Sequence, residues 1–300
     1  MKAVVGMIAP FSLAGEWYKG NLHTHSTESD GQASPQQLVD IYAENAYDFL
    51  AITDHMRLTD TTGLEARGMV LIPGSELHGG QGELGQHYHV VALGVREPIS
   101  FAADATAQQV MEAATARSEL CFVAHPSWSS LTYRDLLSLP DHLGIEVYNT
   151  TCHHGIGRGE SAVQWDDLLA RGQRLLGLAV DDAHLHYPDA IGGWVMVKAP
   201  ERSEAALLTA LRQGHFYSST GPTIEMLESE EDRLYVKCSP VQEIRVICPK
   251  PGHGSTSYRL GRPGPFTEAE FAVREAWEVV RVEVVDARGR VAWSNPIWFV

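Results

Sequence analysis

The sequence predicts an α/β protein that begins with a β/α barrel and ends with a small antiparallel β-domain. Strand-like and helix-like segments alternate over the first two-thirds of the 300 residues, which is the pattern of parallel β-α units. So many units favour a barrel over an open sheet. From about residue 227, polar and apolar positions alternate without helical periodicity, which predicts antiparallel strands in a sandwich-like arrangement. We therefore expect domains at residues 1–226 and 227–300.

Apolar runs predict the strands of the first domain, and helix-like segments separate several of them. The segment SPQQLVDIYAENAYD predicts a helix, because Ser34 is a favourable N-cap, Pro35 suits the first helical position and the apolar residues share a face. Segments 106–120 and 203–214 also read as helices, and the second ends at a glycine stop signal. The predicted strands are 49–53, 69–76, 87–94, 121–126, 144–149, 175–184 and 194–198.

The predicted second domain differs from the first in its histidine content. Of the 14 histidines, only His215 and His253 lie after residue 186. The chemistry therefore belongs to the first domain. The predicted strands of the second lie in the segments RLYVKCS, EIRVIC, EAEFAVRE, WEVVRVEVVDARGR and PIWFV.

Composition excludes several classes of function. Lys and Arg number 23 against 38 Asp and Glu, so the formal net charge is −15, and a surface of this sign repels nucleic-acid phosphates. No apolar stretch approaches the length of a membrane span, so we expect no membrane partner. The four cysteines form no CxxC pair, which indicates reduced, buried thiols and a cytoplasmic protein.

The segment GNLHTHSTESDG carries the first sign of metal chemistry. His23 and His25 are two residues apart, so on a strand they point the same way and can bind one ion. Two hydrogen-bonded surface histidines fit this short pattern equally well.

The later strands favour the metal site over the surface histidines, because acids and histidines recur at or near the carboxyl ends of these strands. In a barrel, the loops after the strands form the active site. Nine nitrogen and oxygen ligands exceed what one zinc needs and therefore indicate two or three metal ions. The candidates are His23, His25, Asp30, His55, Glu76, His89, His125, Asp182 and His184.

These motifs make the chain recognisable. HTHSTESDG, AITDH, GSE, HVVALG, AHPSW, GIEVYN and AVDDAH resemble, in order and over roughly residues 17 to 190, the motifs of the PHP (polymerase and histidinol phosphatase) superfamily of metal-dependent phosphoesterases. The later segment GGWVMVKAPERSEAALLTALRQGHFYSSTGP resembles a subgroup that includes a carbamate-insecticide (carbaryl) esterase. The resemblance implies a distorted seven-stranded β/α barrel.

The resemblance also implies a role for each ligand. His23 and His25 would hold a first metal with Asp182, and Glu76 would bridge it to a second metal. His125 and His89 would be the other ligands of that second metal, with His87 as the alternative to His89. A third would be held by Asp30, His55 and His184. Many relatives have histidine at the position of Asp30, so this third site is more anionic and harder. Glu76, Asp182 and His184 are the expected catalytic residues.

Other residues near these motifs have expected roles outside the ligand set. The loop segment 150–159 contains His154 and Arg158, which are candidate substrate contacts because an arginine can clamp a phosphate or carboxylate. A solvated loop arginine fits the pattern equally well. Glu146 is expected to bond a ligand histidine, because a buried acid needs a partner. Asp181 is expected behind the ligands or as a helix cap, and Trp128 as a wall of the pocket. His78 and His142 are expected at the surface, and so is His186, although it could reach the rim.

The predicted function is a metal-dependent hydrolase with manganese, iron or zinc as cofactor. A hydroxide held between two metals would attack a small phosphomonoester or nucleotide. The alternative substrate is a carboxyl or carbamate ester. A different class of protein, a non-catalytic metal-binding module that presents the β-domain to a partner, is the second alternative. The complete set of nine ligands favours the enzyme.

Overall fold

One long sheet runs through most of the molecule in the computed structural model, which describes residues 10–230, 232–258 and 263–299. Its strand order is β13-β12-β15-β16-β9-β8-β1-β2-β3-β4-β5-β6-β7, with β17 paired to β15. The strands of its first part are β1 (Glu16–Asn21), β2 (Phe49–Ile52), β3 (Val70–Gln81), β4 (His87–Leu93), β5 (Leu120–Val123), β6 (Gly144–Asn149), β7 (Leu176–Val180), β8 (Trp194–Ala199) and β9 (Phe216–Ser219).

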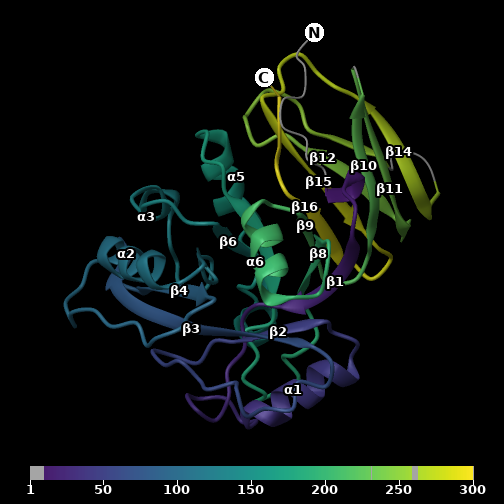
Figure 1. Cartoon of the computed structure of the whole chain (residues 1–300). Coiled ribbons are helices and arrows are strands. Elements are labelled where there is room, and N and C mark those ends of the chain that lie inside the picture. The colour runs from purple at the N-terminus through teal and green to yellow at the C-terminus, as the bar shows by residue number, and fades with distance from the viewer. Residues whose placement is uncertain (1–9, 231, 259–262, 300) are drawn as a thin grey trace.

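Helices surround this first part of the sheet (Figure 1). They are the 3-10 helix η1 (Pro10–Ser12), α1 (Pro35–Glu44), α2 (Ala107–Arg117), α3 (Tyr133–Leu137), α4 (Thr150–Ile156), α5 (Ala162–Ala170) and α6 (Glu204–Arg212). The result is a mixed α/β protein, as the sequence predicts. Among the described residues, no helix has the length and apolar character needed to cross a membrane.

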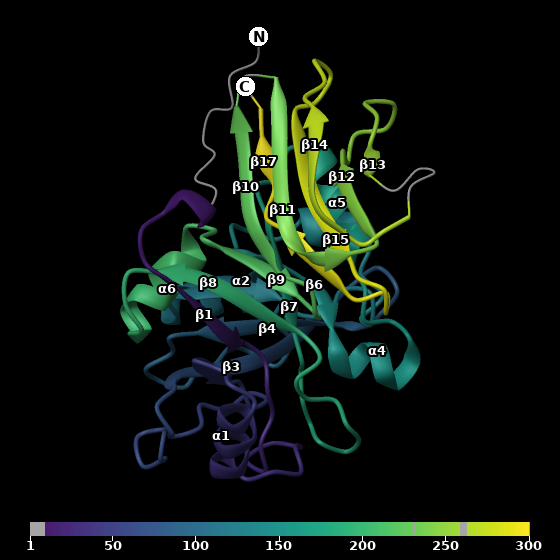
Figure 2. The same ribbon diagram turned by 90° about the vertical axis from the view of Figure 1, so that its right-hand side faces the viewer.

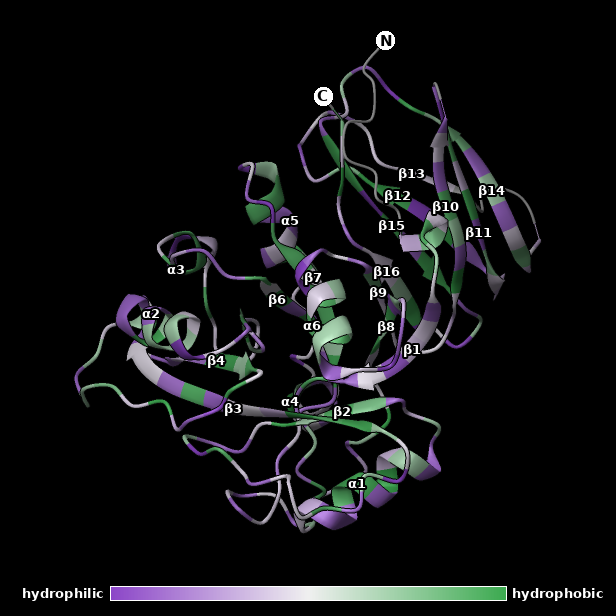
Figure 3. Ribbon diagram, viewed as in Figure 1, coloured by the Kyte–Doolittle hydropathy of each residue, from purple (hydrophilic) through white to green (hydrophobic). Residues whose placement is uncertain are grey.

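The predicted start of α1 is confirmed. Ser34 accepts a hydrogen bond from the Gln37 backbone, and the Gln37 side chain accepts one from the backbone of Ser34, while Pro35 opens the helix. Leu38 and Tyr42 are fully buried. Figure 3 shows the two-sided colouring of α1 beside the hydrophobic β2, so the amphipathic pattern positions this helix over the strand that leads to His55.

Strand direction differs from a simple series of parallel units around β4. The pairs β1–β2, β2–β3, β5–β6 and β6–β7 are parallel, but β4 is antiparallel to both β3 and β5. The physical reason is the connection, because residues 82–86 are too few for a crossover and allow only a hairpin. In addition, β3 continues to Gln81, whereas the predicted strand ends at residue 76.

The end of the sheet at β7 returns to its middle. Ser218 of β9 accepts a hydrogen bond from the Ala179 backbone at 3.0 Å and donates one to the carbonyl of Gly177 at 2.7 Å. β8 runs antiparallel to β1. The strand ends that carry the candidate ligands are therefore gathered around one centre.

The C-terminal strands form two layers around their own core. A three-stranded sheet, β10-β11-β14, lies in front of β12 and β15 in Figure 2, and Val236, Phe271 and Val282 belong to one hydrophobic cluster between them. The expected boundary at 226/227 falls within β10, and the division into domains stays a prediction. The strands are β10 (Ile224–Glu230), β11 (Arg233–Val241), β12 (Glu243–Ile247), β13 (Thr256–Tyr258), β14 (Phe266–Ala272), β15 (Val279–Val285), β16 (Val291–Ser294) and β17 (Ile297–Trp298).

Several elements are absent from the sequence prediction. β1 is one of them, because its sequence EWYKGN contains no apolar run. The Lys19 ammonium group of this strand lies over the rings of Tyr47 and Trp194. The helices α3 and α4 have only five and seven residues. α5 did carry a signal, since its buried Trp165, Leu168 and Leu169 have helical spacing. All four cysteines are free and buried, as predicted.

Candidate metal centre

All nine predicted ligands come together in one cluster. Two of them follow β1, one follows β2, one follows β5 and two follow β7, while Glu76 and His89 lie within the paired strands β3 and β4. Asp30 reaches the cluster from the loop before α1. Every member has a nitrogen or oxygen atom within 4.0 Å of an atom of another member.

The innermost group consists of His23, His25, Glu76 and Asp182, all buried. The Nε2 atoms of the two histidines are 3.1 Å apart, and each lies 3.0–3.2 Å from Glu76 Oε2 and Asp182 Oδ1. Ligand atoms bonded to one ion at about 2.0–2.2 Å lie roughly 3.0–3.5 Å from each other. Glu76 Oε2 and Asp182 Oδ1 have no hydrogen-bond partner. This donor set fits a divalent cation.

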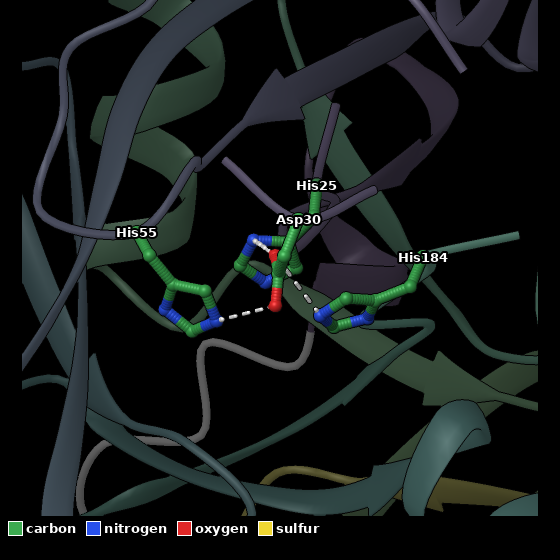
Figure 4. A group of neighbouring side chains, drawn as sticks. All are labelled: His25, Asp30, His55 and His184. Atoms are coloured by element: carbon green, nitrogen blue, oxygen red, sulfur yellow. Dashed lines mark ion pairs between the residues drawn. The ribbon is translucent and has the colours of Figure 1, made fainter. Parts of the chain in front are cut away.

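A second group lies on the open side of the first. Figure 4 shows the carboxylate of Asp30 between the rings of His25, His55 and His184. Its oxygens are 3.8, 3.7 and 3.5 Å from the nearest nitrogens of these rings. The Asp30 side chain is 54% exposed, which makes it the most exposed of the candidate ligands.

A third group consists of His55, Glu76 and His89. His89 Nδ1 lies 2.7 Å from Glu76 Oε1, and His125 Nε2 lies 3.2 Å from the same oxygen. His87, the predicted alternative to His89, is exposed and contacts the Gly80 carbonyl instead. The assignment of each ligand to a metal stays a prediction. His25 belongs to the first and second groups, and His55 belongs to the second and third.

Buried acids hold the ligands in position. Glu146 accepts hydrogen bonds from His23 Nδ1 at 2.6 Å, the His125 backbone at 2.7 Å and Asn149 Nδ2 at 2.9 Å. A proton on Nδ1 of His23 leaves the Nε2 lone pair directed at the cluster. The expectation that Glu146 bonds a ligand histidine is confirmed. Asn149, which the sequence analysis missed, also donates to Asp182 at 3.1 Å.

Two aspartates beside the ligands have purely supporting contacts. Asp181 accepts hydrogen bonds from the side chains of Asn21, Tyr42 and Thr150 and from the backbone of residues 191–193. The prediction that it lies behind the ligands is confirmed. Asp54, also missed, accepts four bonds from Ser26, Ser29 and Thr59. A signal for it existed, since it directly precedes His55.

Unusual backbone angles occur at two of the ligand positions. His125 has φ +27° and Asp182 has φ +56°, in the left-handed region that costs free energy for residues other than glycine. The segment around Asp182 is held by pairing with the chain after β1, where its amide donates to the His23 carbonyl and His25 donates to the Ala183 carbonyl, both at 2.9 Å. This pairing keeps the two ligand segments in register.

The pKa shifts in the cluster favour positive charge beside its carboxylates. Burial opposes a charge on His25, but the carboxylates of Asp182 and Glu76 beside it raise its pKa to about 9. Burial also opposes ionisation of Glu76, yet His23 and His89 hold its pKa well below the usual value. Burial lowers the pKa of His55 to about 4, so this imidazole is neutral and able to bind a cation.

The cluster forms the floor of a cavity of about 310 Å³. Trp128 lines it, as predicted, and stands edge-on to the rings of His125 and His89 at 5.0 and 5.9 Å. His186 also lines it, so this residue does reach the rim. The remaining walls consist of Thr151, Cys152, Tyr187 and Asp189.

The other predicted polar residues lie outside this cavity. Arg158 donates to Ser130 at 2.9 Å, and His154 is exposed on α4; their role in substrate binding stays a prediction. His78 is exposed, as expected, with its ring 5.7 Å from those of His55 and His89. His142 is half-buried, and its Nδ1 contacts the Pro140 carbonyl.

No protein-family model and no curated protein sequence matches the chain. A two-domain protein from Bacteroides vulgatus ATCC 8482, containing a predicted PHP-like metal-dependent phosphoesterase, matches with TM-score 0.50 at 18% identity, over 91% of each chain. An amidohydrolase from Chromobacterium violaceum matches with TM-score 0.43 at 18% identity, over 57% of this chain and 89% of that chain. The first likeness shows that this chain shares its fold with the Bacteroides protein along almost its whole length.

Proposed function

We propose that the protein is a metal-dependent hydrolase of the PHP type that cleaves small phosphoesters. The scaffold would be the distorted β/α barrel that the sequence predicts, followed by its β-sandwich-like domain. The single observation that carries the proposal is the position of Glu76. Its Oε1 faces His89 and His125, whereas its Oε2 faces His23, His25 and His55. One carboxylate thus has two different sets of ligands on its two oxygens.

The nine ligands would hold two or three divalent ions of manganese, iron or zinc. Such ions lower the pKa of water, polarise the substrate and stabilise the departing oxygen. Glu76 lies between the neighbouring groups and reduces the repulsion between cations by its negative charge. Asp182 and His184 complete the proposed catalytic set, and Glu146 keeps His23 in the tautomer that presents Nε2. Arg158 and His154 are proposed to contact the part of the substrate that extends beyond the cavity.

Metal analysis followed by a substrate comparison tests the proposal. Protein purified without chelator and reconstituted with manganese, iron or zinc should bind at least two ions per chain and hydrolyse a phosphoester panel. Chelated protein is the control. Faster hydrolysis of p-nitrophenyl acetate than of every phosphoester would select the ester alternative. Full metal occupancy without hydrolysis of any substrate would select the non-catalytic binding module.

A further inference from the structure

The walls of the cavity carry acids but no cationic side chains. Four carboxylates line it, those of Asp30, Glu76, Asp182 and Asp189, and no lysine or arginine is among its described lining residues. Two arginines near the ligands in the sequence have other partners, since Arg57 pairs with Glu28 and Arg158 donates to Ser130. A histidine that binds a metal is neutral, so in the metal-loaded cavity the positive charge for a substrate anion comes from the metal ions.

The formal charges in the cavity limit the negative charge that a substrate can carry. Two or three divalent ions contribute four or six positive charges, and the four carboxylates remove four, so the loaded cavity carries between zero and plus two. A hydroxide nucleophile lowers this by one. A dianionic phosphomonoester leaves the site net negative in every case, whereas a monoanion can be neutralised when three ions are bound. Uncompensated like charge in a partly buried site is costly.

Three side chains of the cavity lining, those of Trp128, Cys152 and Tyr187, are uncharged, and two of them are aromatic. Burial raises the pKa of the Cys152 thiol, so this group is uncharged. The Tyr187 hydroxyl donates to the Thr151 carbonyl at 2.9 Å, and this bond holds the exposed ring at the cavity. The half-buried Trp128 offers an indole ring beside His125. These surfaces suit an uncharged aromatic group.

We infer that the substrate is a monoanionic phosphodiester with an aromatic or similarly flat organic group that contacts Trp128. This inference rests on the proposed function and narrows it, against the phosphomonoester that the sequence predicts. One water is consumed: a new P–O bond forms and the P–O bond to the departing alcohol breaks. One proton of the water passes to the departing oxygen, and the other is released to solvent. The product is a dianionic monoester. The four carboxylates disfavour its binding, so its remaining P–O ester bond is not cleaved.

Stoichiometry and rate give the first test. The metal-loaded protein should release one p-nitrophenolate from each bis(p-nitrophenyl) phosphate, with kcat/KM at pH 8 at least about tenfold above that for p-nitrophenyl phosphate. A tenfold ratio corresponds to about 1.4 kcal/mol of transition-state stabilisation. Release of two equivalents, or equal rates on both, overturns the inference while the proposed function stands. Failure to cleave either ester, or any other phosphoester, counts against the proposed function itself.

Calorimetry gives a readout that does not depend on turnover. Methyl phenylphosphonate, a monoanion, should bind the metal-loaded protein more tightly than phenylphosphonate at a pH where the latter is a dianion. Trp128→Ala should weaken the binding of the monoanion about five- to tenfold through loss of the aromatic contact. Trp128→Phe should restore most of the lost affinity. Methyl methylphosphonate, which lacks the ring, is the matched control and should change less than about twofold. If Trp128→Ala weakens the binding of methyl phenylphosphonate and methyl methylphosphonate equally, with metal content unchanged, the proposed role of Trp128 is wrong.

Discussion

Two buried clusters of ionisable side chains lie in this molecule, and their compositions differ. The candidate metal centre contains only carboxylates and imidazoles, and its inner oxygens on Glu76 and Asp182 have no hydrogen-bond partner. The second cluster lies where α5 meets β15. There Arg281 pairs with both oxygens of Asp166 at 2.7 and 2.8 Å and also contacts Glu283.

Charges in the second cluster alternate along its whole length. Glu283 pairs with Arg245 at 3.1 Å, Arg245 pairs with Glu243 at 2.8 Å, and Ser257 donates to Glu243 at 2.6 Å. Every acid therefore has a cationic partner supplied by the chain. In the metal centre the chain supplies acids and lone pairs but no permanent cation. The contrast distinguishes a cluster whose charges are balanced within the chain from one whose donor atoms suit a metal ion.

The largest expected effect is the loss of turnover in Glu76→Gln. Glutamine has nearly the same shape but is neutral, and its amide nitrogen is a poor ligand, so the variant should lose metal from the groups that Glu76 joins. Hydrolysis should fall by roughly a thousandfold or more, the scale of several kcal/mol of metal-supplied stabilisation. Metal content, circular dichroism and rate should be measured together.

His55→Ala is the matched comparison for Glu76→Gln. A histidine nitrogen binds one ion, so this variant should keep more activity and more metal than Glu76→Gln, while both remain folded. If Glu76→Gln retains its metal and near-native activity, Glu76 supports only the strand pairing of β3 and β4.

The metal content itself is the next prediction. Two or more transition-metal ions per chain should be present after purification without chelator, because the donor atoms form three overlapping groups. Chelation should abolish hydrolysis and lower the melting temperature, since ions that bind only the folded state stabilise it. The measurement is elemental analysis with thermal unfolding. Less than one ion per chain after reconstitution contradicts the assignment.

The second cluster should respond in the opposite way. Arg281→Ala leaves Asp166 and Glu283 without their shared partner and should lower the free energy of unfolding by about 3–5 kcal/mol, the usual cost of breaking a buried pair. Metal content per folded chain should stay unchanged. The double variant Arg281→Met with Asp166→Leu removes both charges and should be less destabilised than Arg281→Ala. Denaturant unfolding checks both, and loss of metal in either variant would remove the distinction between the clusters.

The sequence predicted the metal centre better than the second cluster, for a physical reason. Most candidate ligands follow or lie in an apolar strand, and strand ends meet in space. The local sequence was therefore sufficient to place His55 or Asp182. Arg281 and Asp166 are 115 residues apart, and no local pattern connects them. The antiparallel direction of β4 was also missed, although the short connection before it carries the signal.

Side-chain orientation is the other part that the sequence could not supply. The spacing of His23 and His25 predicts that both face one ion, and the 3.1 Å separation agrees. It does not predict that His25 also faces Asp30, because this depends on the loop that brings residue 30 back over β1. The supporting contacts of Asn149 and Asp54 depend in the same way on packing between segments.

Asp30→His should have the smallest effect of these changes and concerns the most exposed ligand. Asp30 adds an anion beside His25, His55 and His184, and an anionic oxygen favours a harder metal than a third imidazole does. Histidine there should raise zinc retention relative to manganese and change turnover by about tenfold, the lower end of the effects that follow changes around a metal site. Asp30→Asn is the matched control, since it keeps the shape and removes the charge. Metal analysis after dialysis against equal zinc and manganese checks the prediction. If all three proteins hold the same ions in the same amounts, Asp30 is not a ligand, and its carboxylate serves only to order the loop before α1.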